Sequence, residues 1–343
     1  MSQDDRYSRQ IIFPGIGAEG QRRLGAGFAV VVGCGALGCT IASALVRAGV
    51  GRVRLIDRDL IEIHNLHRQS LYTEPDIAAD LPKAEAAALH LREANPEVEI
   101  EAVVADFSPV NAQKLVEGAG VVVDALDNFE ARFLINDVAL KLEIPWVYGG
   151  AVASTGMTAV FLSGGRPCFR CLVRSAPVGG TLTCDTAGVV NTAPWITGSL
   201  EATEAMKILI ADEQTAPVGR DLVLFDVWQR SFESLPLAGF ADPECPACVA
   251  GTYDFLEGPP RTRIISLCGQ NAVQIGDTTS TGMPLTQIAE RLRALGPVEA
   301  GPRMVRFPVG EQELVIFPDG RTLVRGTRDE TLARSLYARY IGA

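Results

Sequence analysis

Several features that would direct the interpretation of a new sequence are missing from these 343 residues. No apolar run approaches the roughly 18–20 residues that cross a bilayer. The first residues, MSQDDRYSRQ, include acidic residues where a signal peptide is basic, and no apolar core follows them. An excess of positive charge is also missing, because the formal net charge is −10. We therefore expect a cytoplasmic protein with no membrane segment and no broad electrostatic surface for nucleic acid.

Histidine is scarce, with three residues, whereas cysteine is present at eight positions. A reducing compartment does not maintain a disulfide framework, so the cysteines are interpreted as metal ligands, reactive thiols or small core residues. Cys34, Cys39 and Cys268 are expected to be core residues.

The order of apolar segments predicts an α/β fold with a doubly wound, Rossmann-like sheet. Residues 28–33 form a continuous apolar run, as in a parallel strand that is covered on both faces. Leu37, Ile41 and Leu45 then recur at helical spacing. Strand and helix alternate further along the chain, which is typical of doubly wound sheets. The other expected strands are RVRLID, VEIEAVVADF, GVVVDALDN, PWVYGGAV, GMTAVFL and LVLFDVW, with helices around 83–94 and 131–142.

The chain is long for one domain. Residues 255–261, FLEGPPR, are expected to be a loop, and we place a boundary there, giving domains 1–260 and 261–343. The second domain is predicted to be a small α+β unit. Its expected strands are RIISL, AVQIG, MVRFPV, ELVIFP and RTLVRG, its expected helices lie near 285–295 and 331–340, and FPDGRT predicts a hairpin.

The segment GCGALG lies between the first strand and the first helix, and it predicts a nucleotide site. Gly33 allows a tight turn, Gly35 lets the backbone approach a phosphate, and Gly38 lets the helix pack on the strand. The helix N–H groups then face the anion. Asp57, 22 residues after Gly35, is placed to bind a ribose hydroxyl. The alternative is a glycine turn between strand and helix that binds no nucleotide. The motif alone does not distinguish NAD from ATP.

Polar residues further along the chain favour ATP. Asn65, Arg68, Gln69 and Lys83 follow closely, and cationic side chains that converge on phosphates stabilise a departing pyrophosphate. Asp127, after a later strand, is a candidate ligand for Mg²⁺. Taken singly, the cations can equally be solvated surface charges, and Asp127 a helix cap.

Two Cys-x-x-Cys pairs predict a metal centre. Cys168 and Cys171 form CFRC, and Cys245 and Cys248 form CPAC, 74 positions later. Four thiolates suit a tetrahedral, structural Zn²⁺ that clamps distant segments together. A redox dithiol would need no second pair, and buried unligated cysteines are the other alternative.

Together these segments resemble the MoeB/ThiF family of adenylyltransferases, which activate ubiquitin-like sulfur carriers and are related to ubiquitin-activating enzymes. The resemblance covers residues 6 to about 250. The segments that carry it, in the family's order, are RYSRQ, GCGALG, AGVGRVRLIDRD, NLHRQ, LPKAEAA, DALDN, CFRC, TCDTAGV, GSLEATEAMK and CPAC. It implies a homodimer that uses Mg-ATP to adenylate the C-terminal Gly-Gly carboxylate of a small carrier protein.

The resemblance also implies roles for individual residues. Gly33 and Gly35 would line the ATP phosphates and Asp57 would bind the ribose. Arg9 matches an arginine that reaches the ATP site of the neighbouring subunit. Cys184 matches a position that takes part in covalent or persulfide chemistry in some relatives and is dispensable in others, so an inert cysteine is the alternative. Contacts to ATP or its metal would come from Asp59, Asn65, Arg68, Gln69, Lys83 and Asp127.

The chain departs from the family pattern in two places. The segment VNTAPWIT has a shifted Pro194 and an inserted Trp195, close to where the carrier tail should pass, so the identity of the carrier stays open. The region after about 262 is additional to the minimal enzyme and is not a rhodanese-type domain; it would dock a partner or stabilise the dimer.

The expected function is ATP-dependent adenylylation of a sulfur carrier, for cofactor or thiolated-tRNA biosynthesis. Four alternatives stay open: adenylation of a peptide or tRNA-nucleoside carboxylate, activation of a ubiquitin-like protein for conjugation, an NAD-dependent oxidoreductase, and a non-enzymatic scaffold.

Overall fold

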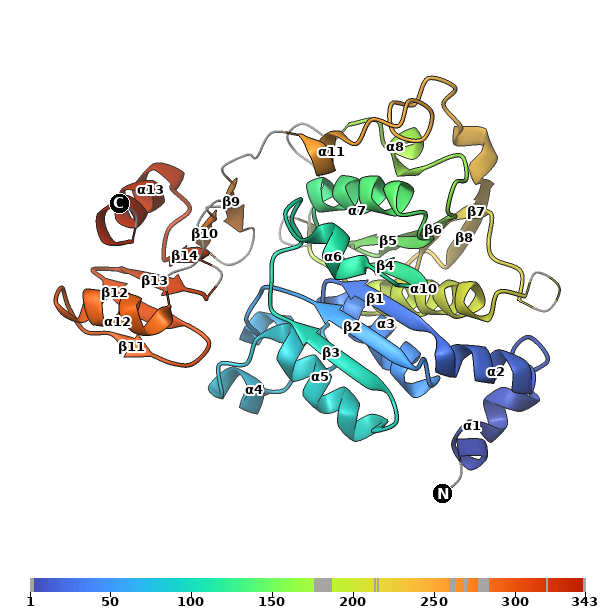
Figure 1. Cartoon of the computed structure of the whole chain (residues 1–343), viewed down its shortest axis with the longest axis horizontal. Helices are drawn as coiled ribbons and strands as arrows, with labels where there is room; N and C mark the ends of the chain where they lie inside the picture. The colour runs from blue at the N-terminus through green and yellow to red at the C-terminus, as the bar shows by residue number, and fades with distance from the viewer. Residues whose placement is uncertain are drawn as a thin grey trace. The chain divides into compact units, whose positions relative to one another are not determined.

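The computed structural model describes residues 3–175, 187–212, 214, 216–258, 263–267, 271–276, 284–318 and 320–341. The chain divides into two compact units, Met1–Gly258 and Pro259–Ala343 (Figure 1). Within the described ranges, no helix is both long enough and apolar enough to span a bilayer.

An eight-stranded sheet forms the centre of the first unit (Figure 1). Its strand order is β3-β2-β1-β4-β5-β6-β7-β8, parallel from β3 to β5 and antiparallel from β5 to β8. The strands are β1 (Phe28–Val32), β2 (Arg52–Ile56), β3 (Glu99–Val103), β4 (Val121–Asp124), β5 (Trp146–Val152), β6 (Thr155–Phe161), β7 (Asp221–Asp226) and β8 (Ser231–Pro236).

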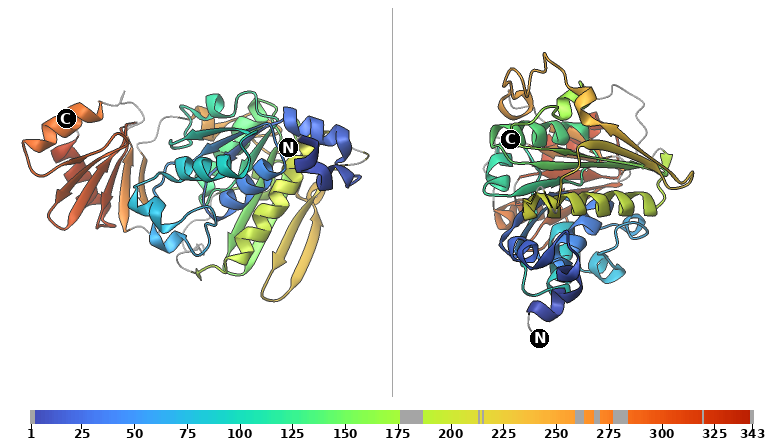
Figure 2. Two further views of the ribbon diagram at one scale, coloured as in Figure 1. Left: turned by 90° about the horizontal axis from the view of Figure 1, so that it is seen from below. Right: turned by 90° about the vertical axis from the view of Figure 1, so that its right-hand side faces the viewer.

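Helices cover both faces of this sheet, as Figure 2 shows. Side chains of β1 alternate between two cores: Ala29 and Val31 face α3, α5 and α10, while Val30 and Val32 face α6 and α7. The prediction of a doubly wound α/β fold is thus confirmed. The helices are α1 (Gln3–Ile12), α2 (Gly17–Ala26), α3 (Ala36–Arg47), η1 (Ile63–Asn65), α4 (Glu74–Ala78), α5 (Lys83–Ala94), α6 (Ala112–Val116), α7 (Phe129–Lys141), α8 (Phe169–Leu172), α10 (Thr192–Ile210), η2 (Leu237–Phe240) and α11 (Asp254–Glu257).

The periodicity seen in the sequence explains how α3 packs. Leu37, Ile41 and Leu45 are all buried in the first core, at successive turns of the helix. Burying each such side chain contributes about 1.5–3 kcal/mol. This apolar stripe fixes α3 on the sheet and therefore fixes the glycine loop at its N-terminus.

The second unit contains a six-stranded antiparallel sheet in the order β11-β12-β13-β14-β10-β9. Its core is formed by strand side chains with α12 and α13, and β13 and β14 form the hairpin expected from FPDGRT. The elements are β9 (Arg263–Leu267), β10 (Ala272–Gly276), α12 (Leu285–Arg293), β11 (Glu299–Ala300), β12 (Val305–Val309), β13 (Gln312–Ile316), β14 (Thr322–Arg325) and α13 (Glu330–Tyr340).

Several elements differ from the sequence-based expectation, since α1, α2 and α10 were not predicted as helices. β8 was not predicted, because all six of its residues are exposed and so show no alternation between a buried and a polar face. The segment expected to be a loop at 255–261 begins inside a short helix, α11. That helix is stabilised by a distant residue, since the backbone N–H of Phe255 donates to Asp137 at 2.9 Å.

Candidate functional site

The glycine loop joins β1 to α3 and leaves the N-terminus of α3 open. Gly33 has a φ of +101°, and a Cβ added there would lie 2.5 Å from the carbonyl oxygen of Ala125. A Cβ at Gly38 would lie 2.1 Å from the carbonyl oxygen of Gly33. Gly35, the N-cap of α3, is different: the nearest atom to an added Cβ is Nε2 of Gln69, at 3.9 Å. Packing therefore requires glycine at the first and third positions, while the second faces space that a ligand can enter.

Asp57 follows β2 and is bound to the backbone of the glycine loop. Its Oδ2 accepts the N–H of Cys34 at 2.7 Å, and its Oδ1 accepts the N–H of Asp59 at 2.7 Å. Burial raises the pKa of Asp57, while the charge of Lys83 opposes that shift. The carboxylate is thus held beside the loop, where the sequence predicts ribose recognition.

Lys83 is the first residue of α5, and its side chain is buried. Its Nζ lies 2.9 Å from Oδ2 of Asp59, and its backbone N–H donates to the Asp59 carbonyl at 2.9 Å. Burial alone would lower the pKa of Lys83, but the charges of Asp59 and Asp57 outweigh it and hold that pKa above its ordinary value. The site therefore contains a fixed ammonium charge.

Two residues that the sequence did not single out belong to the same cluster. Nη1 of Arg58 lies 3.0 Å from Oδ1 of Asp106, and its Nε lies 3.7 Å from Oδ1 of Asp59. Arg58 stands between two predicted site residues in the segment IDRD, which was an available signal. Asp106 follows β3, and no local pattern marks it.

The segment NLHRQ contributes a buried amide whose oxygen has no hydrogen-bond partner in the described part of the chain. Asn65 is buried, and its carbonyl accepts the N–H groups of both Arg68 and Gln69. Gln69 is 4% exposed, and its Oε1 has no hydrogen-bond partner among the residues that the structure describes. Buried polar atoms are rarely left unpaired. The Gln69 amide lies beside the open position of Gly35, where a hydroxyl of a bound nucleotide would donate to its unpaired oxygen.

Asp127 is exposed in the loop between β4 and α7, and its charge adds to the larger effects of Asp59 on the pKa of Lys83 and of Asp106 on the pKa of Arg58. The Asp127 carboxylate is therefore close enough to these two cations for their charges to interact. It is not the helix cap that the sequence left open, because the N-cap of α7 is Asn128.

The backbone before Asp127 is held by a buried ion pair. Oδ1 of Asp124 accepts the N–H of Leu126 at 2.9 Å, and Nη2 of Arg132 donates to the carbonyl of Leu126 at 2.6 Å. Arg132 also lies 3.0 Å from Asp124 through its Nε. Burial raises the pKa of Asp124 to about 6, although Arg132 opposes the shift.

The other two predicted catalytic residues are not in this cluster. Arg9 is exposed on α1, a helix whose Tyr7 accepts a hydrogen bond from Asn95, the C-cap of α5. Lys83 lies at the opposite end of α5, so Arg9 is remote from the site of its own chain. Its role in the site of a second copy stays a prediction. Cys184 lies outside the described residues.

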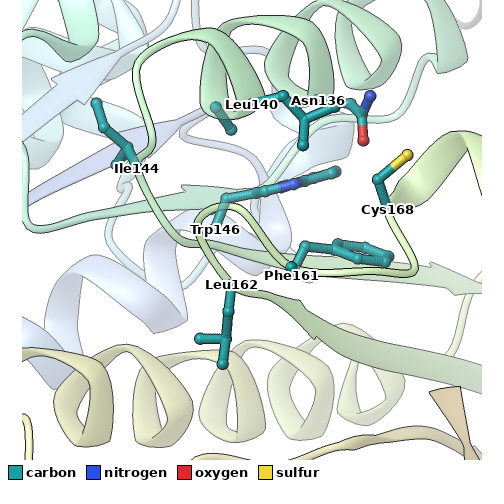
Figure 3. Close-up of a pocket in the computed structure, with 9 residues that line it drawn as sticks. Asn136, Leu140, Ile144, Trp146, Phe161, Leu162 and Cys168 are labelled. Atoms are coloured by element: carbon teal, nitrogen blue, oxygen red, sulfur yellow. The ribbon is translucent and has the colours of Figure 1, made fainter. Parts of the chain in front are cut away.

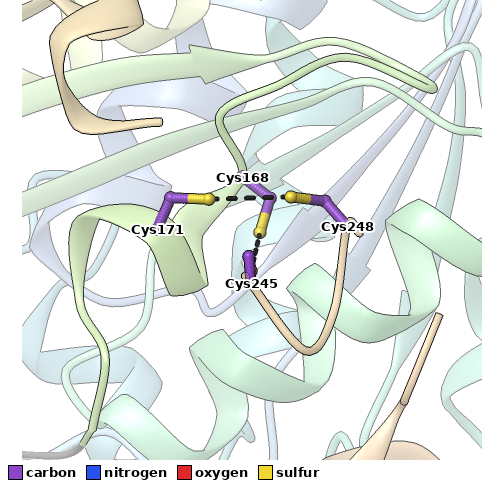
Figure 4. Close-up of side chains that lie close together, drawn as sticks. All are labelled: Cys168, Cys171, Cys245 and Cys248. Carbon is purple, nitrogen blue, oxygen red and sulfur yellow. Dashed lines mark hydrogen bonds between the residues drawn. The ribbon is translucent and has the colours of Figure 1, made fainter. Parts of the chain in front are cut away.

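The four predicted metal ligands come together in one cluster (Figure 4). Their Sγ atoms all lie within 4.8 Å of one another; Cys168 and Cys245 are 3.7 Å apart, and Cys171 and Cys248 are 3.6 Å apart. Four sulfurs about 2.3 Å from one ion lie about 3.8 Å apart in a tetrahedron. These separations and four thiol donors fit zinc, and they exclude disulfide bonding between the two pairs.

A small pocket lies beside this centre, against Cys168 (Figure 3). It is lined mainly by apolar side chains from α7, β5 and β6, among them Leu140, Trp146 and Phe161, and it has room for about one water molecule. None of the residues around the glycine loop lines it. The pocket is therefore a packing gap beside the four cysteines and not a substrate site.

Comparison with known proteins agrees with this arrangement. The model of the ThiF family matches residues 7–247. A sulfur carrier protein ThiS adenylyltransferase from Bacillus subtilis is 40% identical over 338 residues, which is 98% of this chain and 99% of the relative. A sulfur carrier protein adenylyltransferase from Thermus thermophilus is 42% identical over 250 residues, 71% of this chain and 90% of the relative.

Among solved structures, E. coli MccB with ATP is similar, with a TM-score of 0.61 and 21% identity over 71% of this chain and 74% of that one. This likeness shows a shared fold. The family match covers well over half of the chain, and the resemblance deduced from the ordered motifs is confirmed. The chain belongs to the ThiF family of adenylyltransferases.

Proposed function

We propose that this protein uses ATP to adenylate the C-terminal Gly-Gly carboxylate of a ubiquitin-like sulfur-carrier protein, with release of pyrophosphate. The activated carrier would then serve sulfur transfer in the synthesis of a cofactor or of thiolated tRNA. The observation that supports this most is the similarity to the ThiS adenylyltransferase, because it runs through both units of the chain.

The geometry supports ATP as the nucleotide. The open position at Gly35 and the N-terminus of α3 would receive the phosphates, and the Asp57 carboxylate beside the loop would bind the ribose. A donor on the nucleotide, such as a ribose hydroxyl, would pair with the Oε1 of Gln69, and Lys83 would add a buried positive charge. Asn65 and Asp59 would complete the contacts to ATP or its metal.

The reaction itself needs little more than positioning and charge. An oxygen of the carrier carboxylate attacks the α-phosphorus, the bond from that phosphorus to the bridging oxygen of the β-phosphate breaks, and pyrophosphate leaves. No general base is required, because a carboxylate is already ionised at neutral pH. Arg68, Lys83 and Arg9 of a second copy would stabilise the charge that develops on the leaving group.

Two metals are part of the proposal. Asp127 would hold Mg²⁺, which neutralises phosphate charge. The four cysteines would hold Zn²⁺ with all positions filled by thiolate, so that this ion has a structural role. Residues 1–260 would form the catalytic domain, and residues 261–343 a domain that docks the carrier or another partner.

A second candidate rests on another relative. The SAMP-activating enzyme E1 of Haloferax volcanii is 42% identical over 257 residues, 75% of this chain and 93% of the relative. This supports a use of the same carboxylate activation for protein conjugation. The two candidates share the adenylation step and differ in the acceptor that follows.

ATP–pyrophosphate exchange tests the proposal. The purified full chain is assayed with a panel of carriers that end in Gly-Gly and with the same carriers lacking the last glycine. We expect exchange only with an intact carrier, its loss in Lys83→Ala, and its retention in the control Lys114→Ala, which removes an exposed lysine on α6. No exchange with any carrier, together with tight NAD binding, would show that the proposal is wrong.

A further inference from the structure

The first turn of α10 is bonded to the segment that carries Arg68. The indole Nε1–H of Trp195 donates to the backbone carbonyl of Arg68 at 2.8 Å. The side-chain amide of Asn191 donates to the carbonyl of His67 at 3.3 Å. Two donors from the start of α10 therefore hold two successive carbonyls of NLHRQ. Trp195 is also where the sequence departs from the family pattern, so this contact gives that departure a structural role.

The start of α10 is itself fixed against the glycine loop. A Cβ added at Gly198, one turn after Trp195, would lie 2.9 Å from the carbonyl oxygen of Leu37 and 3.0 Å from Cβ of Thr40. Both of these residues are in the first turns of α3, the helix that begins at the glycine loop. Because α10 and α3 approach so closely, the indole has a set position relative to the place where phosphates would bind.

Arg68 is held at its backbone on both sides. Its N–H donates to the carbonyl of Asn65 at 3.0 Å, and its own carbonyl receives the indole N–H. Its guanidinium donates through Nη1 to the exposed carbonyl of His64 at 2.8 Å. The backbone of Arg68 is thus fixed while its charged end lies in a partly exposed place. Loss of the indole donor would free the carbonyl of Arg68. The backbone from which its side chain extends would then be less well fixed.

We propose that Trp195 is a positioning residue for the adenylation site, which acts by holding the backbone of Arg68 so that its guanidinium is presented to the phosphates of ATP. This inference rests on the proposed function, because it needs a nucleotide at the glycine loop. One hydrogen bond of this kind corresponds to about a three- to tenfold change in a binding constant. The change should appear in the affinity for MgATP and not in the affinity for the carrier.

The test is calorimetric titration of the full chain with MgATP. Trp195→Phe keeps an aromatic ring and removes the donor, and we expect MgATP to bind about three- to tenfold more weakly. Trp228→Phe is the matched control, since Trp228 is 74% exposed, and its affinity should equal that of the wild type. In an Arg68→Ala background, Trp195→Phe should have no further effect, because residues that act through one another are non-additive.

Equal affinity of Trp195→Phe and wild type would overturn the inference. So would the same loss in the Arg68→Ala background, because Trp195 would then act on the fold and not through Arg68. If Trp195→Phe does not fold, Asn191→Ala replaces it, with an expected loss of about two- to threefold that must also vanish with Arg68→Ala. A wild type that binds MgATP without carrier-dependent exchange would refute the proposed function alone, whereas one that binds no MgATP would refute both.

Discussion

Replacing Asp137 with asparagine removes one carboxyl group from the core of the first unit. The carboxyl lies where α7 contacts the segment that follows the last of the four clustered cysteines. Asp137 is a fully buried residue of α7, and its Oδ2 accepts the N–H of Phe255 at 2.9 Å. Its neighbour Asn136 accepts the N–H of Phe169, which lies between the first two cysteines. Burial raises the pKa of Asp137 to about 6, although the bond from Phe255 opposes the shift.

The direction of this pKa shift determines how the stability of the protein changes with pH. The carboxyl has a pKa of 3.8 when it is free and about 6 in the folded chain, so the folded state binds the proton more tightly. Its contribution to the free energy of unfolding is complete below pH 3.8 and is lost as the pH rises through 6. Between pH 4.5 and pH 7.5 this linkage amounts to a loss of about 2 kcal/mol.

Asparagine retains an oxygen for the N–H of Phe255 and does not titrate. We therefore expect the stability of Asp137→Asn relative to wild type to increase by about 2 kcal/mol between pH 4.5 and pH 7.5, whatever its value at either pH. Urea unfolding of the zinc-loaded chain, followed by circular dichroism, measures both values. Glu117→Gln, which removes an exposed charge, is the control. A relative stability that is equal at the two pH values, or lower at pH 7.5, would refute the reasoning.

Three further outcomes are expected. Gly38→Ala places a Cβ 2.1 Å from the carbonyl of Gly33, so it should lower stability by about 1–3 kcal/mol and reduce MgATP affinity, as thermal melting and calorimetry would show; unchanged values would contradict the packing argument. Elemental analysis should find one zinc per chain, and Cys245→Ser should release it and lower the melting temperature; a zinc-free wild type of equal stability would refute the structural role. Arg132→Met leaves the buried Asp124 carboxylate without its ion pair, so it should cost about 3–5 kcal/mol in urea unfolding at pH 7.5, and much less where Asp124 is protonated; a loss that does not depend on pH would count against this explanation.

The contrast between local pattern and distant contact is clearest at the glycine loop. GCGALG, with a strand before it and a helical stripe of Leu37, Ile41 and Leu45 after it, could be interpreted from sequence because steric rules act within a few residues. The orphaned Oε1 of Gln69 could not, because burial of that amide depends on the packing of segments that are far apart in the chain.

The sequence by itself determined the alternating elements, the parallel part of the sheet and the residue types available for a nucleotide and a metal. These follow from periodicity, turn sterics and donor chemistry, which are local properties. Only the tertiary structure decided that the sulfurs of Cys168 and Cys245 lie 3.7 Å apart, that Arg58 pairs with Asp106, and that Trp195 holds Arg68. The physical reason is that hydrogen bonds and ion pairs act over a few ångströms, and which side chains reach that range is set by how whole helices pack on the sheet.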